Sequence, residues 1–155
     1  MARVERTRRG EYRLRLPTEE RELIGSLVAQ LRQILETDDP DLRRLTPPAY
    51  QDDPEREREY RELVGDELSR GRSRALDVVE ATADANRLDE DQMSAWLAAV
   101  NDLRLVLGTR LEVTEELYER GLPEDDPRAS TYAVYAYLGW LQEQIVESMA
   151  GGLRG

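Results

Sequence analysis

The sequence predicts a mainly α protein, a helical bundle of about four to five helices with a short N-terminal β-hairpin. From residue 17 onward, apolar residues recur at the three- and four-residue spacing of helices, whereas residues 11–16 alternate at period two. The 155 residues are the usual size of one domain. We therefore expect a single domain, 1–155, made of a basic β-hairpin arm (1–16), a helical body (17–150) and a tail (151–155).

The hairpin arm is predicted from alternation and from charge. Tyr12, Leu14 and Leu16 alternate with arginines, and Arg9-Gly10 supplies a turn toward a partner strand near residues 3–7. The arm has six arginines against two glutamates, a side-chain charge of +4, within a chain of net charge −11. A basic ribbon could contact nucleic acid through its arginines, which are Arg6, Arg8, Arg13 and Arg15. The favoured interpretation is a solvated strand face whose arginines pair with acidic residues of the body.

The first helix is expected after Pro17. Thr18 is a candidate N-cap, and the two glutamates that follow suit the positive end of the helix dipole. The predicted apolar stripe comprises Leu23, Leu27, Leu31 and Leu35, flanked by Ile24, Val28 and Ile34.

The tripeptide Asp-Asp-Pro occurs three times, at 38–40, 52–54 and 125–127. Asp is a preferred N-cap and Pro is favoured at the first helical position, so the tripeptide predicts helix starts. Paired carboxylates can also hold a metal ion or act in catalysis. The alternative is a carboxylate-dependent enzyme or metal-binding protein that uses Asp52, Asp53, Asp125 or Asp126.

A second long helix is expected from about residue 54 to 83. Its first turns alternate in charge and predict a solvated face. Its predicted buried side comprises Tyr60, Leu63, Val64, Leu68, Ala75, Leu76 and Val79.

The third helix is predicted to begin at a capping box formed by Asp89 and Gln92. Its expected buried residues are Trp96, Val100, Leu103, Leu107 and Leu111. A polar edge on this helix is the candidate partner-binding site, with Asn101, Asp102, Arg104, Thr109 and Arg110. The alternative, which we favour, is a polar network that ties this helix to its neighbours.

The last helix, from Pro127 to about Ala150, is unusually apolar. One stripe comprises Val134, Leu138, Leu141, Ile145 and Met149. Aromatic residues occupy further flanks, and such residues are enriched in interface cores. We expect either a buried central helix or a homodimer interface formed by Tyr132, Tyr135, Tyr137 and Trp140.

The chain contains no Cys, no His and no Lys. These absences exclude thiol and Ser-His catalysis, the usual zinc sites, Schiff bases and Walker-type phosphate loops. We expect no enzyme activity, no cofactor and no metal. The acidity disfavours nucleic acid as a partner. No apolar run approaches the ~20 residues that span a bilayer, so we expect a cytoplasmic protein without a membrane segment.

Several segments resemble an actinobacterial family, catalogued as a domain of unknown function and associated with AosR-like oxidative-stress-responsive regulators. The central run is Trp96-Leu97-Ala98-Ala99-Val100 followed by Asn101-Asp102-Leu103-Arg104-Leu105-Val106-Leu107-Gly108-Thr109-Arg110-Leu111. The other matching segments are Gly10-Glu11-Tyr12-Arg13-Leu14, Glu22-Leu23-Ile24, Thr46-Pro47-Pro48-Ala49-Tyr50-Gln51-Asp52-Asp53 and Tyr137-Leu138-Gly139-Trp140-Leu141-Gln142.

The resemblance implies a helical, non-enzymatic regulator that works with the transcription machinery through a sigma factor or an RNA polymerase region. A cysteine-based redox switch does not transfer to this chain, because it has no Cys. We expect a regulatory protein that acts by protein–protein contact as a homodimer. A DNA-binding regulator that uses the arginine-rich hairpin is the first alternative.

Overall fold

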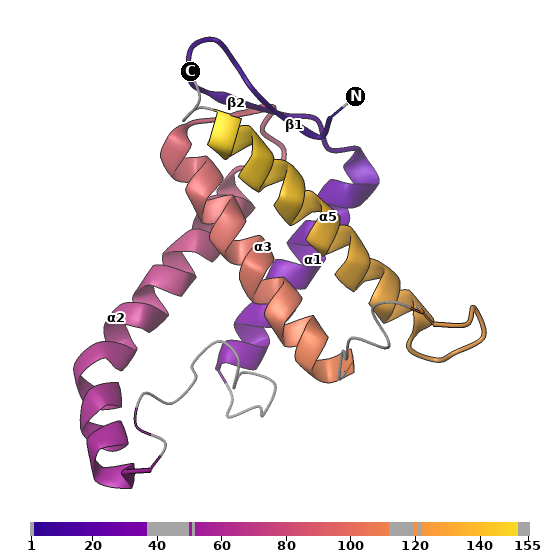
Figure 1. The fold of residues 1–155 in the computed structure, drawn as a ribbon. Helices are drawn as coiled ribbons and strands as arrows, with labels where there is room; N and C mark the ends of the chain where they lie inside the picture. The colour runs from indigo at the N-terminus through magenta and orange to yellow at the C-terminus, as the bar shows by residue number, and fades with distance from the viewer. Residues whose placement is uncertain (1, 37–49, 51, 112–119, 121, 152–155) are drawn as a thin grey trace.

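The computed structural model describes residues 2–36, 50, 52–111, 120 and 122–151. Over this part of the chain, four long helices pack together beneath a small sheet at one end (Figure 1). The helices are α1 (Thr18–Leu35), α2 (Pro54–Ala81), α3 (Glu90–Leu111) and α5 (Ala129–Gly151). The strands are β1 (Val4–Arg6), β2 (Tyr12–Leu14) and β3 (Arg87–Leu88). The predicted fold class is confirmed.

The N-terminal hairpin forms as expected and gains a third strand. β1 and β2 pair antiparallel with Val4 opposite Leu14, and Gly10 occupies the turn at φ +83°, where a residue without Cβ is unstrained. β3 adds to the other edge of β2, pairing Leu88 with Tyr12. β3 was not predicted, because two residues are too few to show alternation.

The core lies where α3 packs against α2 on one side and α5 on the other. Its centre is Trp96, which is fully buried and donates its indole N–H to the Thr82 hydroxyl at 2.7 Å. The sheet covers one end of this core with Tyr12, Leu14 and Leu88. The arm is thus part of the folded body, and it connects the N-terminal segment to the helices.

Two of the predicted helix starts are confirmed and two need correction. The Asp53 carboxylate accepts the Arg56 N–H at 3.2 Å, and Asp89 and Gln92 form the reciprocal capping box. Thr18 is not the cap of α1, because Pro17 occupies that position and no side chain caps the helix. Asp126 accepts the N–H of Arg128, but α5 begins at Ala129, two residues after the predicted start.

The predicted apolar stripe of α1 is only partly the buried one. In α1 the deepest residues are Ile24, Val28 and Leu31, whereas the predicted stripe residues Leu23 and Leu27 are half-buried on its flank. The tripeptide at 38–40 and residues 152–155 of the tail lie outside the described residues.

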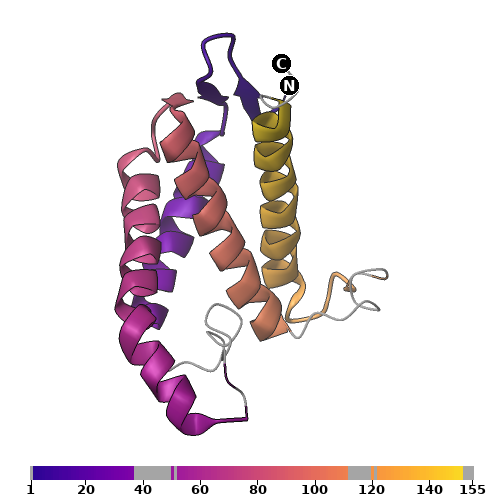
Figure 2. The same ribbon diagram turned by 60° about the vertical axis from the view of Figure 1, so that its left-hand side comes forward.

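The first half of α2 is the main departure from the expected core. Its second half buries Ala75, Leu76 and Val79 as predicted. Residues 54–70, here called the outer half of α2, extend beyond the ends of α1 and α3 (Figures 1 and 2). The expected buried residues there are therefore exposed, Leu63 at 81% and Leu68 at 51%, and Val64 is half-buried. Helical periodicity identifies an apolar face but not whether another element reaches it.

Candidate protein-binding groove

The central and closing segments that resemble the family face each other where α3 and α5 pack. The Gln142 side-chain amide of α5 joins them, since its Nε2 donates to Asn101 Oδ1 at 3.1 Å. Its Oε1 accepts from a terminal nitrogen of Arg104 at 3.4 Å. Hydrogen bonds of this kind fix the register of the two helices without adding much net stability.

Arg104 lies flat against α5. Its guanidinium carbon is 5.2 Å from the centre of the Tyr135 ring, within cation–π range. Gly139 makes this position possible, because a Cβ at residue 139 would approach Arg104 Nε to 3.2 Å. The Nε itself is buried and has no hydrogen-bond partner among the residues that the structure describes. The charged side chain is thus well positioned but incompletely satisfied.

A surface groove of about 860 Å³ opens beside Arg104 along the outer face of α5. Its walls alternate aromatic, aliphatic and acidic side chains from residues 132 to 147. Trp140 and Val146 remain 41% and 47% exposed, although both are large and apolar. Glu143 and Glu147 line the same groove and are also exposed. We call this feature the α3–α5 groove; it can accept a surface that presents both apolar and charged groups.

The four aromatic residues predicted to form a dimer interface separate into two groups. Tyr132, Tyr135 and Trp140 line the α3–α5 groove. Tyr137 instead packs against the core, beside Glu20 of α1. Its hydroxyl is buried without a hydrogen bond, and burial, followed by the nearby Glu20 carboxylate, raises the pKa of Tyr137 well above its ordinary value.

The five residues predicted as a partner-binding edge do not form one surface. Asp102 pairs with Arg72 of α2 at 3.1 Å, and burial raises the pKa of the Asp102 carboxyl despite this partner. Thr109 is buried and donates its hydroxyl to the Leu105 carbonyl. Arg110 lines a different groove, which also includes Leu27 of α1. Asn101 and Arg104 thus bond to α5 through Gln142, and Asp102 bonds separately to α2 through Arg72, so these polar residues tie α3 to both neighbours.

The groove also contains features that sequence reasoning did not identify. The stacking of Arg104 on Tyr135 depends on the register of two helices, which no single segment encodes. Glu143 and Glu147 stand four residues apart, so their common face could have been read from helical spacing.

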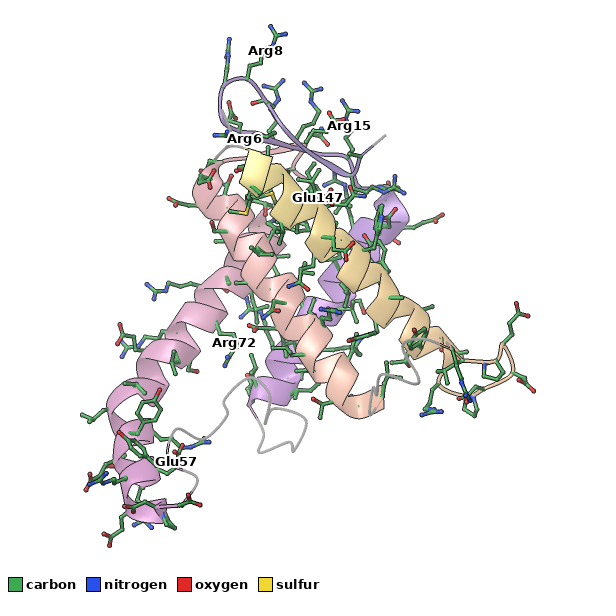
Figure 3. All side chains as sticks on the ribbon, viewed as in Figure 1. Arg6, Arg8, Arg15, Glu57, Arg72 and Glu147 are labelled. Carbon is green, nitrogen blue, oxygen red and sulfur yellow. The ribbon has the colours of Figure 1, made fainter. Side chains whose placement is uncertain are left out.

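The arginines of the hairpin lie at the end of the molecule above α5, and Arg8 at its tip points away from the body (Figure 3). Arg15 pairs with Glu5 across the hairpin at 3.3 Å. Arg6 is exposed and Arg13 half-buried. Contact of these arginines with nucleic acid stays a prediction. Pairing with the acidic body is seen for Arg3, which contacts Glu20 of α1 at 3.0 Å.

The acidic tripeptides were the candidates for metal chemistry. Within the described residues, no three acidic side chains gather closely enough to hold a metal ion. Asp53 and Asp126 instead accept backbone N–H groups at or near helix starts.

In the part of the chain that the structure describes, no helix has both the length and the apolarity needed to cross a bilayer.

Comparison with known proteins places the chain in a family. The family model described as a domain of unknown function, DUF2017, matches residues 1–149. The chain belongs to the DUF2017 family. The resemblance seen in the central and closing segments is thereby confirmed.

The chain is also similar to mycobacterial proteins that are named as regulators. The chain is 35% identical over 130 residues to the "Oxidative stress regulator AosR" of Mycobacterium tuberculosis, covering 73% of this chain and 59% of that protein. It is 33% identical over 147 residues to the "Putative oxidative stress regulator AosR" of Mycobacterium leprae, covering 84% and 66%. The chain thus spans about three-fifths to two-thirds of these relatives. No solved structure matches it significantly.

Proposed function

We propose that this chain is a non-enzymatic regulatory domain that acts by protein–protein contact. The mycobacterial relatives named as oxidative stress regulators support a regulatory role. The observation that carries the proposal is the distribution of exposed large apolar side chains. Among the described residues they gather on two surfaces, the α3–α5 groove and the region around the outer half of α2. Exposed apolar patches of this kind mark protein-binding surfaces.

The partner that fits is a basic region of the transcription machinery, a sigma factor or RNA polymerase. The chain carries a net charge of −11, which steers a basic partner toward it. The outer half of α2 combines exposed Leu63 and Leu68 with exposed glutamates at 59, 62 and 67. Exposed arginines at 56, 58, 61 and 70 alternate with these glutamates, so the surface has an apolar centre and a border of mixed charge, the pattern of a transient interface.

The regulation does not use a thiol in this chain, because it contains no Cys. Control through the amount of protein or through competition between partners requires no redox-active side chain.

A crosslinking pull-down from the source organism, read by mass spectrometry, tests this function. We expect the wild-type protein to recover a sigma factor or polymerase subunit, and Leu63→Glu with Leu68→Glu to lose it. Glu22→Arg, on the exposed face of α1, is the matched control and should retain it. Recovery of no transcription component by the wild type would overturn the proposal.

A further inference from the structure

Much of the outer face of α5 is uncovered in the described fold, and the Arg3 guanidinium lies 5.6 Å from the centre of the Trp140 ring. Leu138, Leu141 and Ile145 point into the core, and the opposite face presents Trp140 and Val146 to solvent. Figure 2 shows α5 at one edge of the bundle, with α3 on its inner side. A helix that is apolar on its outer face as well as its inner one is suited to a second packing partner.

Along the axis of α5, one positive side chain is followed by two negative side chains on this face. Arg104 lies at the level of Tyr135 and Gly139, with its Nε unsatisfied among the described residues. Glu143 and Glu147 follow one and two turns later on the same groove, about 6 Å and 12 Å along the helix axis. Neither carboxylate pairs with any cation in the described part of the chain.

Because the positive and negative charges are separated along α5, the groove of one copy is complementary in charge to the same groove of a second, antiparallel copy. If two copies of α5 lie antiparallel about a two-fold axis near Trp140, the Arg104 of one copy stands opposite Glu143 of the other. The symmetry repeats the same contact a second time, as in any isologous interface. The two Trp140 rings then meet at the centre, where aromatic residues contribute most to binding. We propose that the occupant of the α3–α5 groove is a second copy of this chain, paired through α5.

Other occupants fit the groove less well. A small anion would bind Arg104 but would be repelled by Glu143 and Glu147, which line the same groove. The −11 charge of each copy opposes association at long range, yet at physiological salt such repulsion is screened beyond about 8 Å. Contacts within the groove, rather than the net charge, therefore determine whether two copies associate. Of the two surfaces on which the proposed regulatory function rests, pairing of two copies occupies the α3–α5 groove and leaves the outer half of α2 for the regulatory partner.

Sedimentation velocity from about 1 to 100 µM tests the pairing on the intact protein. We expect the wild type to reach twice the 17.8 kDa mass of one chain. Ala136→Arg should remain monomeric, because Ala136 is exposed in the groove and its replacement adds bulk without touching the core. Glu22→Arg, the control on α1, should dimerise like the wild type.

Charge reversal tests the register. Arg104→Glu and Glu143→Arg should each weaken the dimer roughly tenfold or more, because each sets like charges opposite one another. The double variant, with both reversals in one chain, should recover most of the affinity. Far-UV circular dichroism confirms the fold of each variant, and Ala136→Arg serves if an Arg104 variant fails to fold.

Three outcomes would overturn the inference. They are a wild type that is monomeric at 100 µM, a dimer that Ala136→Arg leaves intact, and folded single reversals that the double variant does not rescue. A failed pull-down with an intact groove dimer would count against the proposed function alone.

Discussion

At the scale of single residues, two buried side-chain donors differ in whether they find an acceptor within the described residues. Trp96 and Thr82 satisfy each other inside the core, and the Thr82 hydroxyl donates in turn to the Val78 carbonyl at the end of α2. Arg104 Nε has no such partner among the described residues, and it lies beside an open groove. The first arrangement stabilises the fold, whereas the second leaves a buried donor unsatisfied.

The Thr82 hydroxyl should be important for stability. Thr82→Val keeps the shape of the side chain but leaves the Trp96 N–H buried without an acceptor, at a cost of about 1–3 kcal/mol. Thr82→Ser, which retains the hydroxyl, should lose far less. Urea denaturation of the three proteins measures the difference. Equal unfolding midpoints for wild type and Thr82→Val would contradict the role of this hydrogen bond.

At the scale of elements, α2 has two halves with different environments. The inner half packs against α3 and α1, whereas the outer half presents Tyr60, Leu63 and Leu68 to solvent. Exposed apolar residues that persist in a protein of this acidity are better explained by binding than by folding.

Two substitutions in the same helix should therefore differ sharply. Leu76→Ala removes a fully buried side chain and should destabilise the protein by about 2–5 kcal/mol. Leu63→Ala, at an exposed position, should change the free energy of unfolding by less than about 0.5 kcal/mol. Chemical denaturation of both variants compares them directly. A large loss for Leu63→Ala would show that the outer half of α2 is packed within the monomer.

Elements were predictable where the signal was local. The hairpin, the capping box at Asp89 and the inner stripe of α5 follow from spacing and side-chain chemistry within a few residues. The outer half of α2, the short strand β3 and the stacking of Arg104 on Tyr135 depend on where distant segments meet. For the site, sequence reasoning identified Arg104 and three of the groove aromatics, but it grouped them with Thr109, Arg110 and Tyr137, which the fold directs elsewhere.

At the scale of the whole molecule, the composition simplifies how stability depends on pH. The chain has no Lys and no Cys, so tyrosines are the only side chains that titrate near pH 10. Burial, together with the hydrogen bond to Glu90, raises the pKa of Tyr12 above the ordinary value of 10.0, and burial also raises that of Tyr137. Above pH 10 the native state therefore holds more protons than the unfolded chain, and stability should fall as the pH rises.

Tyr137→Phe isolates one of these groups. At pH 7 its stability should equal or slightly exceed that of the wild type, because the lost hydroxyl makes no hydrogen bond. Between pH 10 and 11 its loss of stability should be smaller by up to about 1.4 kcal/mol per pH unit. Denaturation at a series of pH values measures both. The same alkaline slope in wild type and variant would contradict the environment assigned to Tyr137.

The two tryptophans allow a direct test of whether α5 pairs with a second copy. Trp96 is fully buried and Trp140 is 41% exposed in the single chain, so Trp140 dominates quenching by acrylamide. At a concentration where the wild type is dimeric, its Trp140 should be protected, and in monomeric Ala136→Arg it should be quenched. Equal quenching in the two proteins would contradict the pairing, because Trp140 would then be outside any interface.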